Sequence, residues 1–404
     1  MTLEIQKKTA YFLSAAIIGL ALFASVTPSP LYGTYSELWG FSPAVLTLVF
    51  ATYAFGVLTT LILAGRVSDE VGRRPVLLVA LASLLVTTIV YMLAQSVVWL
   101  FVARGLQGLA TGLAVAAASA ALLDLHPRRD PAGAGLANGV ASAGGLGLGM
   151  LVSASVVEWL PAPRVLPFVV LFVLFAIAFS GALLMPEPVA ERRRPRLTPQ
   201  RPGVPPVVRR PFLLAALGVL SSWSIGGLFF SLGPALSAQI FGTSNHFVTG
   251  VTVVVLAGAG ALSQLAFGRA APWLGASLGS IALAIGLLLI VLASAEESAA
   301  VLLAGSLVAG IGFGVAFLGS LRQLVGAIPN QHRAEVMSAF YVVAYASLSV
   351  PAVLAGILVT PLGLQTTFEI FGSVVAAIAL VLALEAWRTR PRTRPVALGF
   401  ESAS

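Results

Sequence analysis

The densest group of ionisable residues in this sequence is the stretch Gly-Arg-Val-Ser-Asp-Glu-Val-Gly-Arg-Arg-Pro, from Gly65 to Pro75. Five of these eleven residues are ionisable, whereas only 9% of the whole chain is Asp, Glu, Lys or Arg. Long apolar runs flank the stretch on both sides. Charges at such a position can pair with one another and with helix ends. We therefore predict a network that holds helix ends together; the alternative is a set of solvated loop charges.

Arg104 is the second feature of the sequence that could take part in binding or proton coupling, because it is a charged residue inside the apolar run 98–123. A charge costs roughly 2.5–3.5 kcal/mol at the centre of a membrane. The side chain could avoid this cost by extending to the outer interface. It could instead bind carbonyl groups that Pro28 and Pro30 free in the first helix. A third role is to bind an anionic substrate or to couple to a carboxylate, for which Glu37 is the nearest candidate by topology.

Long apolar helices must position these residues. Apolar residues make up 58% of the 404 residues and the mean hydropathy is +0.98, which is outside the range of ordinary soluble proteins. A helix needs roughly 20 apolar residues to cross the hydrocarbon core. The sequence predicts twelve spans, at 11–36, 43–64, 76–95, 98–123, 133–158, 164–185, 212–239, 247–267, 275–294, 299–326, 334–360 and 364–386. The predicted fold class is an all-α integral membrane protein, and we expect the first span to be retained.

The placement of charge predicts the orientation in the membrane. With twelve spans, both termini lie on one side, and 21 of the 23 Lys and Arg residues fall on that side. The positive-inside rule makes this side cytoplasmic. Anionic lipid headgroups account for the net charge of +8, so the lipid bilayer is the expected partner and nucleic acid is not. The high ratio of arginine to lysine is typical of GC-rich bacteria, so we expect a bacterial inner membrane.

The residue types exclude several kinds of chemistry. The chain has no cysteine, which removes disulfides, thiol catalysis and thiolate metal sites. The three histidines, His126, His246 and His332, are scattered and show no metal-ligand spacing. No span carries paired acids, a His–Glu cluster or an activated nucleophile, so an enzyme is not expected. We expect no metal and no cofactor other than a proton gradient.

The chain is predicted to consist of two similar halves. The segment from about Met185 to Pro211 is rich in proline and arginine and has no apolar run, which is typical of a linker. Landmarks that recur across it at an offset of 202–204 residues are Pro30 and Pro234, Gly65 and Gly268, and Pro127 and Pro329. We predict a six-helix bundle at 1–186, a cytoplasmic linker at 187–211, a second six-helix bundle at 212–387 and a cytoplasmic tail at 388–404. Duplicated transporters place the substrate between such halves.

The charged stretch resembles the signature of the major facilitator superfamily, Gly-x-x-x-Asp-x-x-Gly-Arg-Lys/Arg, between helices 2 and 3. The matching residues are Gly65, Asp69, Gly72, Arg73 and Arg74. The resemblance implies a twelve-helix transporter with a cytoplasmic latch. In that latch the Asp faces the start of helix 11, and the first Arg pairs with an acid at the end of helix 4.

Asp124 stands where the acid of helix 4 is expected, and Glu335 lies near the start of helix 11. The resemblance thus implies a latch that stabilises the outward-open state. Glu70 departs from the basic residue that is usual in the signature. The second copy of the loop, from Gly268 to Gly275, keeps the turn but lacks the acid. We therefore expect the two halves to latch asymmetrically.

Two further stretches resemble the drug:proton antiporter branch of the superfamily. The sequence Arg104-Gly-Leu-Gln107-Gly108 matches the Arg-x-x-Gln-Gly motif of helix 4, which implies that Arg104 and Gln107 act in substrate binding or proton coupling. Helix 5 is glycine-rich but lacks the proline of the branch's antiporter motif. Its glycines are Gly139, Gly144, Gly145, Gly147 and Gly149.

None of the fifteen acidic residues lies in the middle of a span. Proton-coupled antiport usually requires a carboxylate within the membrane. Proton coupling would therefore use Asp69, Asp124 or Glu37 near the end of a span. Facilitated diffusion without a proton remains the alternative.

The cavity can be inferred only by analogy with the family, in which helices 1, 4, 7 and 10 line it. The polar and aromatic candidates on these and neighbouring helices are Tyr32, Tyr53, Gln107, Asn138, Trp223, Ser224, Phe230, Gln264, Phe313, Phe317, Gln323, Tyr341 and Tyr345. Phe313 with Phe317, and Tyr341 with Tyr345, are spaced to share a helix face. The alternative for each aromatic is packing or contact with lipid. Aromatic and amide side chains without acids suit a hydrophobic, neutral or anionic small molecule.

These observations predict a monomeric secondary transporter of small molecules that works by alternating access. Efflux of a hydrophobic, drug-like compound is favoured, because helices 2–5 resemble the drug:proton antiporter branch. Uptake or facilitated diffusion of a small neutral or anionic solute is the first alternative. A non-transporting membrane receptor or scaffold is an alternative of a different class, and the lack of a soluble effector domain argues against it.

Overall fold

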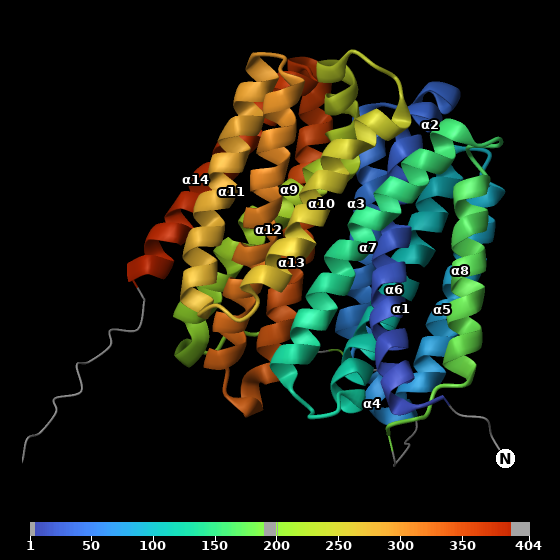
Figure 1. The fold of residues 1–404 in the computed structure, drawn as a ribbon, viewed down its shortest axis with the longest axis vertical. Coiled ribbons are helices and arrows are strands. Elements are labelled where there is room, and N and C mark those ends of the chain that lie inside the picture. The colour runs from blue at the N-terminus through green and yellow to red at the C-terminus, as the bar shows by residue number, and fades with distance from the viewer. Residues whose placement is uncertain (1–4, 190–198, 200, 389–404) are drawn as a thin grey trace, which may run out of the picture.

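The computed structural model describes residues 5–189, 199 and 201–388, and in these residues every regular element is helical (Figure 1). The elements are α1 (Lys7–Val26), η1 (Ser29–Leu31), α2 (Tyr32–Trp39), α3 (Pro43–Ala64), α4 (Val67–Val71), α5 (Arg73–Met92), α6 (Val97–Leu125), α7 (Pro131–Trp159), α8 (Leu166–Leu183), η2 (Pro206–Val208), α9 (Arg209–Phe241), α10 (His246–Phe267), α11 (Pro272–Ala295), α12 (Ala299–Ala327), η3 (Asn330–His332), α13 (Arg333–Leu362) and α14 (Leu364–Arg388).

The described residues contain twelve helical segments that are long and apolar enough to cross a membrane, which confirms the predicted fold class. Large apolar side chains on their outer surface, such as Phe12, Phe55 and Leu262, are more than half exposed and suit contact with lipid. The first span, predicted at 11–36 with an interruption at Pro28 and Pro30, is not a single continuous helix. It is divided into α1, η1 and α2, because Pro28 and Pro30 interrupt the backbone hydrogen bonds.

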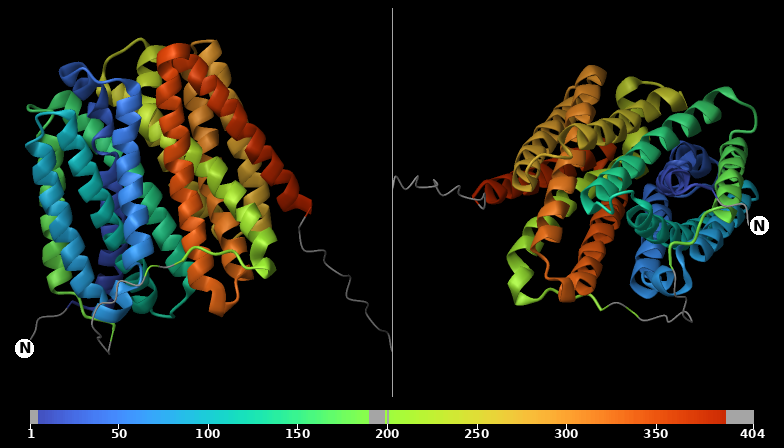
Figure 2. Two further views of the ribbon diagram at one scale, coloured as in Figure 1. Left: turned by 180° about the vertical axis from the view of Figure 1, so that it is seen from behind. Right: turned by 60° about the horizontal axis from the view of Figure 1, so that its bottom comes forward.

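The helices form two groups that lie side by side, α1–α8 and α9–α14 (Figures 1 and 2). The main contacts between the groups are those of α7 with α10 and of α3 with α13. The chain begins α1 and ends α14 on the same face, which we call the terminal face, at the bottom of Figure 1. The other end of the molecule is called the opposite face. The predicted linker at 187–211 and tail at 388–404 lie partly outside the described residues, and α9 begins at Arg209 rather than at 212.

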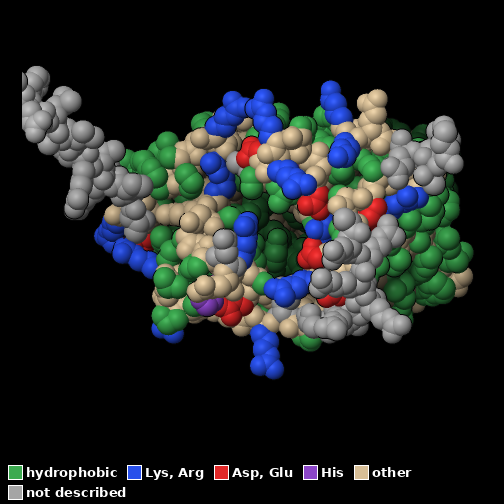
Figure 3. All heavy atoms as spheres, turned by 90° about the horizontal axis from the view of Figure 1, so that it is seen from below, with side chains coloured by type: hydrophobic (Ala, Val, Ile, Leu, Met, Phe, Trp, Pro, Cys, Tyr) green, Lys and Arg blue, Asp and Glu red, His purple; other side chains and the backbone are tan. Residues whose placement is uncertain are grey.

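The two groups enclose a hollow on the terminal face and are joined by hydrogen bonds towards the opposite face, while α7 and α10 stay in contact along their length. Figure 3 shows a hollow between them on the terminal face, with apolar side chains inside it and charged side chains around its rim. Towards the opposite face, the Ser29 hydroxyl donates a hydrogen bond of 2.7 Å to the carbonyl oxygen of Phe230 in α9. This carbonyl is free for that bond because Pro234, four residues later, has no N–H to donate to it. The structure therefore opens to the terminal face.

Helix α7 can approach two neighbours at once because its glycines face in two directions. A side chain at Gly145 or Gly149 would collide with the backbone of α1, at Gly19 and Phe23 respectively. Gly139 and Gly147 instead face α10 of the other group. The glycine-rich sequence of the fifth span thus allows close helix packing within one group and across the junction of both groups.

Candidate functional site

Arg104 on α6 is completely buried within the group α1–α8. Its Nε and Nη2 atoms both donate to the hydroxyl of Tyr32, the former at 2.9 Å. Nη1 donates to the carbonyl oxygen of Ser25 at 2.6 Å. The guanidinium also lies over the rings of Tyr32, Phe50 and Tyr53, at 5.5–5.7 Å from their centroids. Hydrogen bonds and cation–π contacts therefore offset the cost of burying this charge.

The interruption of the first span explains why α6 carries Arg104 and Gln107. Pro28 cannot donate to Ala24 O, and the chain leaves the helical path before it can satisfy Ser25 O. The Gln107 amide donates to Ala24 O at 2.8 Å, while its Oε1 accepts from Arg104 Nη1 at 2.9 Å. The two side chains thus satisfy carbonyl groups left free where the first span is interrupted. Of the roles predicted for Arg104, carbonyl binding agrees with the structure, and extension to the outer interface is wrong.

The structure does not bring the expected carboxylate to Arg104. Glu37 lies on α2, exposed to solvent, and its side chain makes no ion pair with Arg104. Among the described residues no acid contacts the guanidinium. Tyr32 and Tyr53, which were predicted to line the cavity, instead belong to the cluster around Arg104. In this arrangement Arg104 is a cation held entirely by neutral groups.

The charged stretch forms the predicted network at the terminal face. The Arg73 guanidinium donates from Nε to Asp124 Oδ2 on α6 at 3.0 Å and from Nη1 to Asp69 and to Ser68. The Arg73 side chain is 10% exposed, whereas those of Asp124 and Asp69 are 35% and 56% exposed. This nearly buried cation therefore ties the loop between α3 and α5 to the end of α6. The alternative of fully solvated charges does not hold for Arg73.

Glu187 is a member of this network that the sequence did not reveal. Its two carboxylate oxygens accept from the backbone N–H groups of Arg73 and Arg74 at 2.9 and 3.0 Å, at the N-terminus of α5. A carboxylate at this position is favoured by the helix dipole. Gly72 makes room for it, with a φ of 111° and no side chain that would collide with Glu187. The Arg74 side chain donates to Leu183 O at the end of α8.

Glu335 does not join the network in this conformation. Its carboxylate lies 2.6 Å from His332 Nδ1, within the group α9–α14. The separation of Glu335 from the network of Asp69 and Arg73 is consistent with the hollow on the terminal face. A contact between Asp69 and the start of α13 requires that face to be closed. Gly65 caps the end of α3 at the start of the charged loop.

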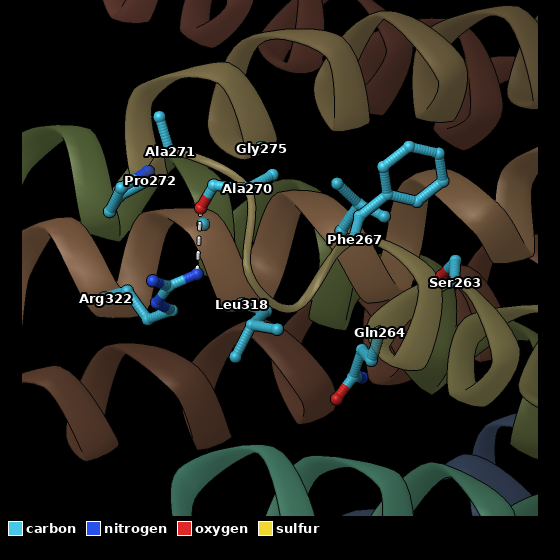
Figure 4. A pocket seen from close by; sticks show the side chains of 11 residues that line it. Ser263, Gln264, Phe267, Ala270, Ala271, Pro272, Gly275, Leu318 and Arg322 are labelled. Carbon is cyan, nitrogen blue, oxygen red and sulfur yellow. Dashed lines mark hydrogen bonds between the residues drawn. The ribbon is translucent and has the colours of Figure 1, made fainter. Parts of the chain in front are cut away.

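The second copy of the loop is held in a different way. Arg322 on α12 donates from Nη1 to the carbonyl oxygen of Gly268 at 2.6 Å and to that of Ala270 at 3.0 Å; Figure 4 shows the bond to Ala270. A cavity of about 10 Å³ lies beside this contact, which is close to the size of one water molecule and too small for a substrate. The asymmetry expected from the sequence is present. A side-chain ion pair holds the first loop, whereas an arginine bound to backbone carbonyls holds the second.

Four of the predicted cavity residues meet in an aromatic cluster of the group α9–α14, towards the terminal face. The Trp223 ring lies 5.2 Å from that of Tyr345, edge to face, and 5.7 Å from that of Phe317. Tyr341 adjoins the cluster through Phe340, at 6.0 Å. Trp223, Phe317, Tyr341 and Tyr345 are all only partly buried. Their helices α9, α12 and α13 thus present a partly accessible aromatic surface.

The other predicted cavity residues are engaged in packing. Phe313 and Phe230 are buried together against Gly226, whereas Phe317, one turn later on α12, belongs to the aromatic cluster. Asn138 on α7 donates to Ser119 Oγ on α6 at 2.7 Å. The remaining residues of this set are Ser224, which is buried, and Gln264 and Gln323, whose buried Oε1 atoms have no hydrogen-bond partner among the described residues.

A contact between the two groups on the opposite face was also missed by the sequence reasoning. Glu158 near the end of α7 accepts from the Asn245 side chain at 2.8 Å and from the His246 backbone N–H at 2.7 Å. It also lies 3.2 Å from His246 Nδ1. The sequence does place Glu158 and His246 at the outer ends of two predicted spans, which could have suggested a contact. Only the packing of α7 on α10 brings the two residues together.

Comparisons with known proteins agree with this architecture. The family model described as Major Facilitator Superfamily matches residues 11–350. The multidrug resistance protein MdtL of Escherichia coli O157:H7 is 34% identical over 100 residues, which cover 24% of this chain and 26% of that protein. MdtL of Klebsiella pneumoniae subsp. pneumoniae is 31% identical over 102 residues, with coverages of 25% and 26%. The matched region thus spans about a quarter of the length of these curated relatives.

Solved structures share the fold at low sequence identity. The human organic anion transporter MFSD10 superposes with a TM-score of 0.68 and 20% identity, over 95% of this chain and 100% of that chain. The xylose transporter XylE of E. coli, in a partially occluded inward-open conformation, gives a TM-score of 0.74 and 13% identity, over 96% and 100%. These similarities show the fold and carry no information about the substrate.

Proposed function

Because this chain belongs to the Major Facilitator Superfamily and is a membrane transporter rather than an enzyme, we propose that it exports hydrophobic, drug-like molecules by alternating access. The observation that carries this proposal is the hollow between the two groups of helices on the terminal face, opposite the end where Ser29 and Glu158 join the groups by hydrogen bonds. A substrate in such a hollow reaches the other side when the groups rock about their junction.

The aromatic cluster of Trp223, Phe317, Tyr341 and Tyr345 supports a hydrophobic substrate. Aromatic rings bury large apolar areas and favour stacking and edge-to-face contacts with planar ligands. No acid lies among these residues to select a cation. We therefore assign these side chains to the substrate site of the proposed exporter.

The direction of transport is supported by the relatives that are named multidrug resistance proteins. Their similarity covers only a quarter of the chain, so it supports export without identifying the compound. The distribution of arginines supports placing the terminal face in the cytoplasm of a bacterial inner membrane. In this orientation the hollow receives substrate from the cytoplasm, as export requires.

The proposal is tested by substrate transport in proteoliposomes. Purified protein is reconstituted, and the movement of hydrophobic fluorescent compounds is followed with and without an imposed proton gradient. We expect transport that the gradient accelerates and that Trp223→Ala reduces several-fold. Phe55→Ala, which removes an exposed aromatic side chain on the outer surface of α3, is the matched control and should transport normally.

Facilitated diffusion of a neutral or anionic solute is the second candidate. It is favoured by one observation, the absence of any carboxylate in contact with Arg104 among the described residues. The same assay separates the two functions. Transport that only follows the substrate gradient, at a rate that the proton gradient does not change, would replace proton-linked export with facilitated diffusion.

A further inference from the structure

A cavity of about 340 Å³ lies at the opposite face, outside the hollow between the two groups. It is formed by three segments of the group α1–α8: the end of α2, the end of α5 with the turn that follows it, and the residues just before α8. Helices α2 and α8 mark this region at the upper right of Figure 1. The volume of the cavity is within the range of pockets that hold small ligands. We call it the outer cavity.

The interruption of the first span creates the outer cavity. After Pro28 and Pro30 the chain runs through η1 into α2, which packs mainly on η1 and α3 and has few contacts with α5 or α8. Gly40, with a φ of 64°, ends α2 and turns the chain towards α3. The rings of Tyr35 and Trp39 line the cavity and stack on each other, with centroids 4.7 Å apart. Helix α2 therefore provides an aromatic wall that faces the other two segments across open space.

Tyr91, at the end of α5, forms another part of the wall. Its ring stacks on that of Phe168 at 4.5 Å, and its hydroxyl donates to Gln107 Oε1 at 3.2 Å. The hydroxyl of Tyr35, by contrast, is buried and has no hydrogen-bond partner among the described residues. An unpaired buried hydroxyl costs free energy, so a polar ligand atom beside it would be favoured.

Arg164 gives the outer cavity a positive charge. Among the described residues it is the only Lys or Arg of the opposite face, and it lines this cavity. It is exposed and forms no ion pair with another described residue. The other charged side chains of this face are acids, none of which lines the cavity: Glu37, Glu158, Glu296, Glu297 and Glu369. An anion is therefore favoured at one position of an otherwise acidic face.

The position of the outer cavity favours a lipid headgroup as this anion. Trp39 and Tyr91 lie at the ends of their helices, where Trp and Tyr are typically found at the level of the headgroups. The cavity also has an apolar edge, because Leu38 and Val165 line it and are 53% and 38% exposed. A phosphate held by Arg164 would thus have apolar surface beside it for the start of an acyl chain. The guanidinium fork of arginine suits phosphate oxygens.

We propose that the outer cavity binds the phosphate and headgroup of an anionic phospholipid, from the leaflet at the opposite face, with Arg164 as the residue that holds the phosphate. Gln95, exposed at the rim, supplies an amide for the oxygen atoms of the headgroup. The bound lipid connects α2 to the start of α8. The site lies within one group of helices, so it does not depend on the hollow or on the proposed function.

The natural absence of cysteine allows a single thiol to report on this site. Ala94→Cys places a thiol in the wall of the outer cavity. Ala299→Cys, exposed at the start of α12 on the same face, is the matched control. Both are reconstituted in nanodiscs of phosphatidylcholine, with or without phosphatidylglycerol, and labelled with a neutral maleimide that does not cross membranes. Nanodiscs leave both faces accessible, so the orientation of the protein does not affect the result.

We expect phosphatidylglycerol to slow the labelling of Ala94→Cys roughly fivefold relative to Ala299→Cys, as one arginine at a lipid surface allows. Arg164→Gln should remove this protection and leave the rate in phosphatidylcholine alone unchanged, which separates loss of the lipid from distortion of the cavity. Arg164→Lys should keep part of the protection. Glu37→Gln, which changes a charge on α2 outside the lining, should keep all of it.

Equal relative rates in both bilayers, or protection that persists in Arg164→Gln, would overturn the site. A last arm adds inorganic phosphate to the nanodiscs of phosphatidylcholine alone. We expect no protection from it, because a free ion lacks the apolar contacts of a lipid. Protection by inorganic phosphate as strong as that by phosphatidylglycerol would show that a free anion is the ligand, and would overturn the assignment to a lipid.

Discussion

Arg104 shows how a charge can be kept inside a membrane protein without a counter-ion. Its donors meet the Tyr32 hydroxyl, Ser25 O and Gln107 Oε1, and aromatic rings face the guanidinium. The planar fork of arginine suits this set of acceptors, which a lysine ammonium cannot reproduce. The residue therefore joins the interrupted first span to α6 in addition to any role in transport.

Replacing Arg104 should destabilise the folded protein. Arg104→Met leaves buried acceptors unpaired, which costs about 1–3 kcal/mol for each group, and Arg104→Lys should recover only part of the loss. The measurement is thermal unfolding of detergent-purified protein. Arg164→Met removes an exposed arginine and should change stability by no more than about 0.5 kcal/mol. Native-like unfolding of Arg104→Met would contradict the structural role and leave only a role in binding.

Asp69→Asn should reduce transport several-fold while expression stays at the native level. Because Asp69 is 56% exposed, its pair with Arg73 adds only about 0–1 kcal/mol to this conformation, so the loss should arise from the outward-open state, in which the terminal face is closed. Proteoliposome transport and membrane yield measure the two effects. Glu385→Gln removes an acid that pairs with Arg388 on the same helix and serves as the control. Transport at the native rate in Asp69→Asn would remove this residue from the latch.

At the scale of elements, α7 acts as the helix that joins the two groups. Gly145 and Gly149 lie four residues apart and face α1, while Gly139 and Gly147 face α10. Glu158, next to the last residue of this helix, contacts the start of α10. The small residues allow close packing along α7. The polar contact of Glu158 at its end can break when the two groups move apart.

The two glycine positions 144 and 145 provide a matched test of this packing. Gly145→Ala forces a methyl group against Gly19 O and should cost about 1–3 kcal/mol. Gly144→Ala, on the neighbouring position of the same helix, meets nothing within 4 Å and should be neutral or slightly stabilising. Thermal unfolding of the two variants compares them directly. Equal stability of both would show that α1 and α7 are not in the close contact described.

At the scale of the whole molecule, the contacts between the groups differ between the two faces. Polar contacts of Ser29 with Phe230 O and of Glu158 with His246 close the opposite face. On the terminal face, the charged network of Arg73 stays within one group and the pair of His332 with Glu335 within the other. The same sequence can therefore exchange one set of contacts for another when the groups rock.

The orientation of the molecule is tested by labelling single cysteines in intact cells. We expect Glu296→Cys to react with an impermeant maleimide from outside, because it is exposed on the opposite face. Gln331→Cys, exposed on the terminal face, should react only after the membrane is made permeable. The physical reason is the excess of arginine on the terminal face. Labelling of Gln331→Cys in intact cells would reverse the assigned orientation.

Hydropathy and charge alone determined the number of spans, their approximate bounds and the class of protein. These features depend on the transfer of each segment into lipid, which is a local property of the chain. The resemblance of the stretch from Gly65 to Pro75 to the superfamily signature likewise predicted the pairing of Arg73 with Asp124. The separation of α1 from α2 follows from Pro28 and Pro30.

Only the tertiary structure decided which distant groups meet. Three side chains bind backbone groups of another element: Glu187 at the start of α5, Arg322 at the second loop, and Glu158 at the start of α10. Backbone N–H and C=O groups are alike along the chain, so the sequence does not indicate which of them will be the partner. The distinction between Phe313 in the packed core and Phe317 in the aromatic cluster depends in the same way on neighbouring helices. Packing determines such contacts because each needs the relative position of two elements, and apolar periodicity cannot supply that position when a helix is apolar on every side.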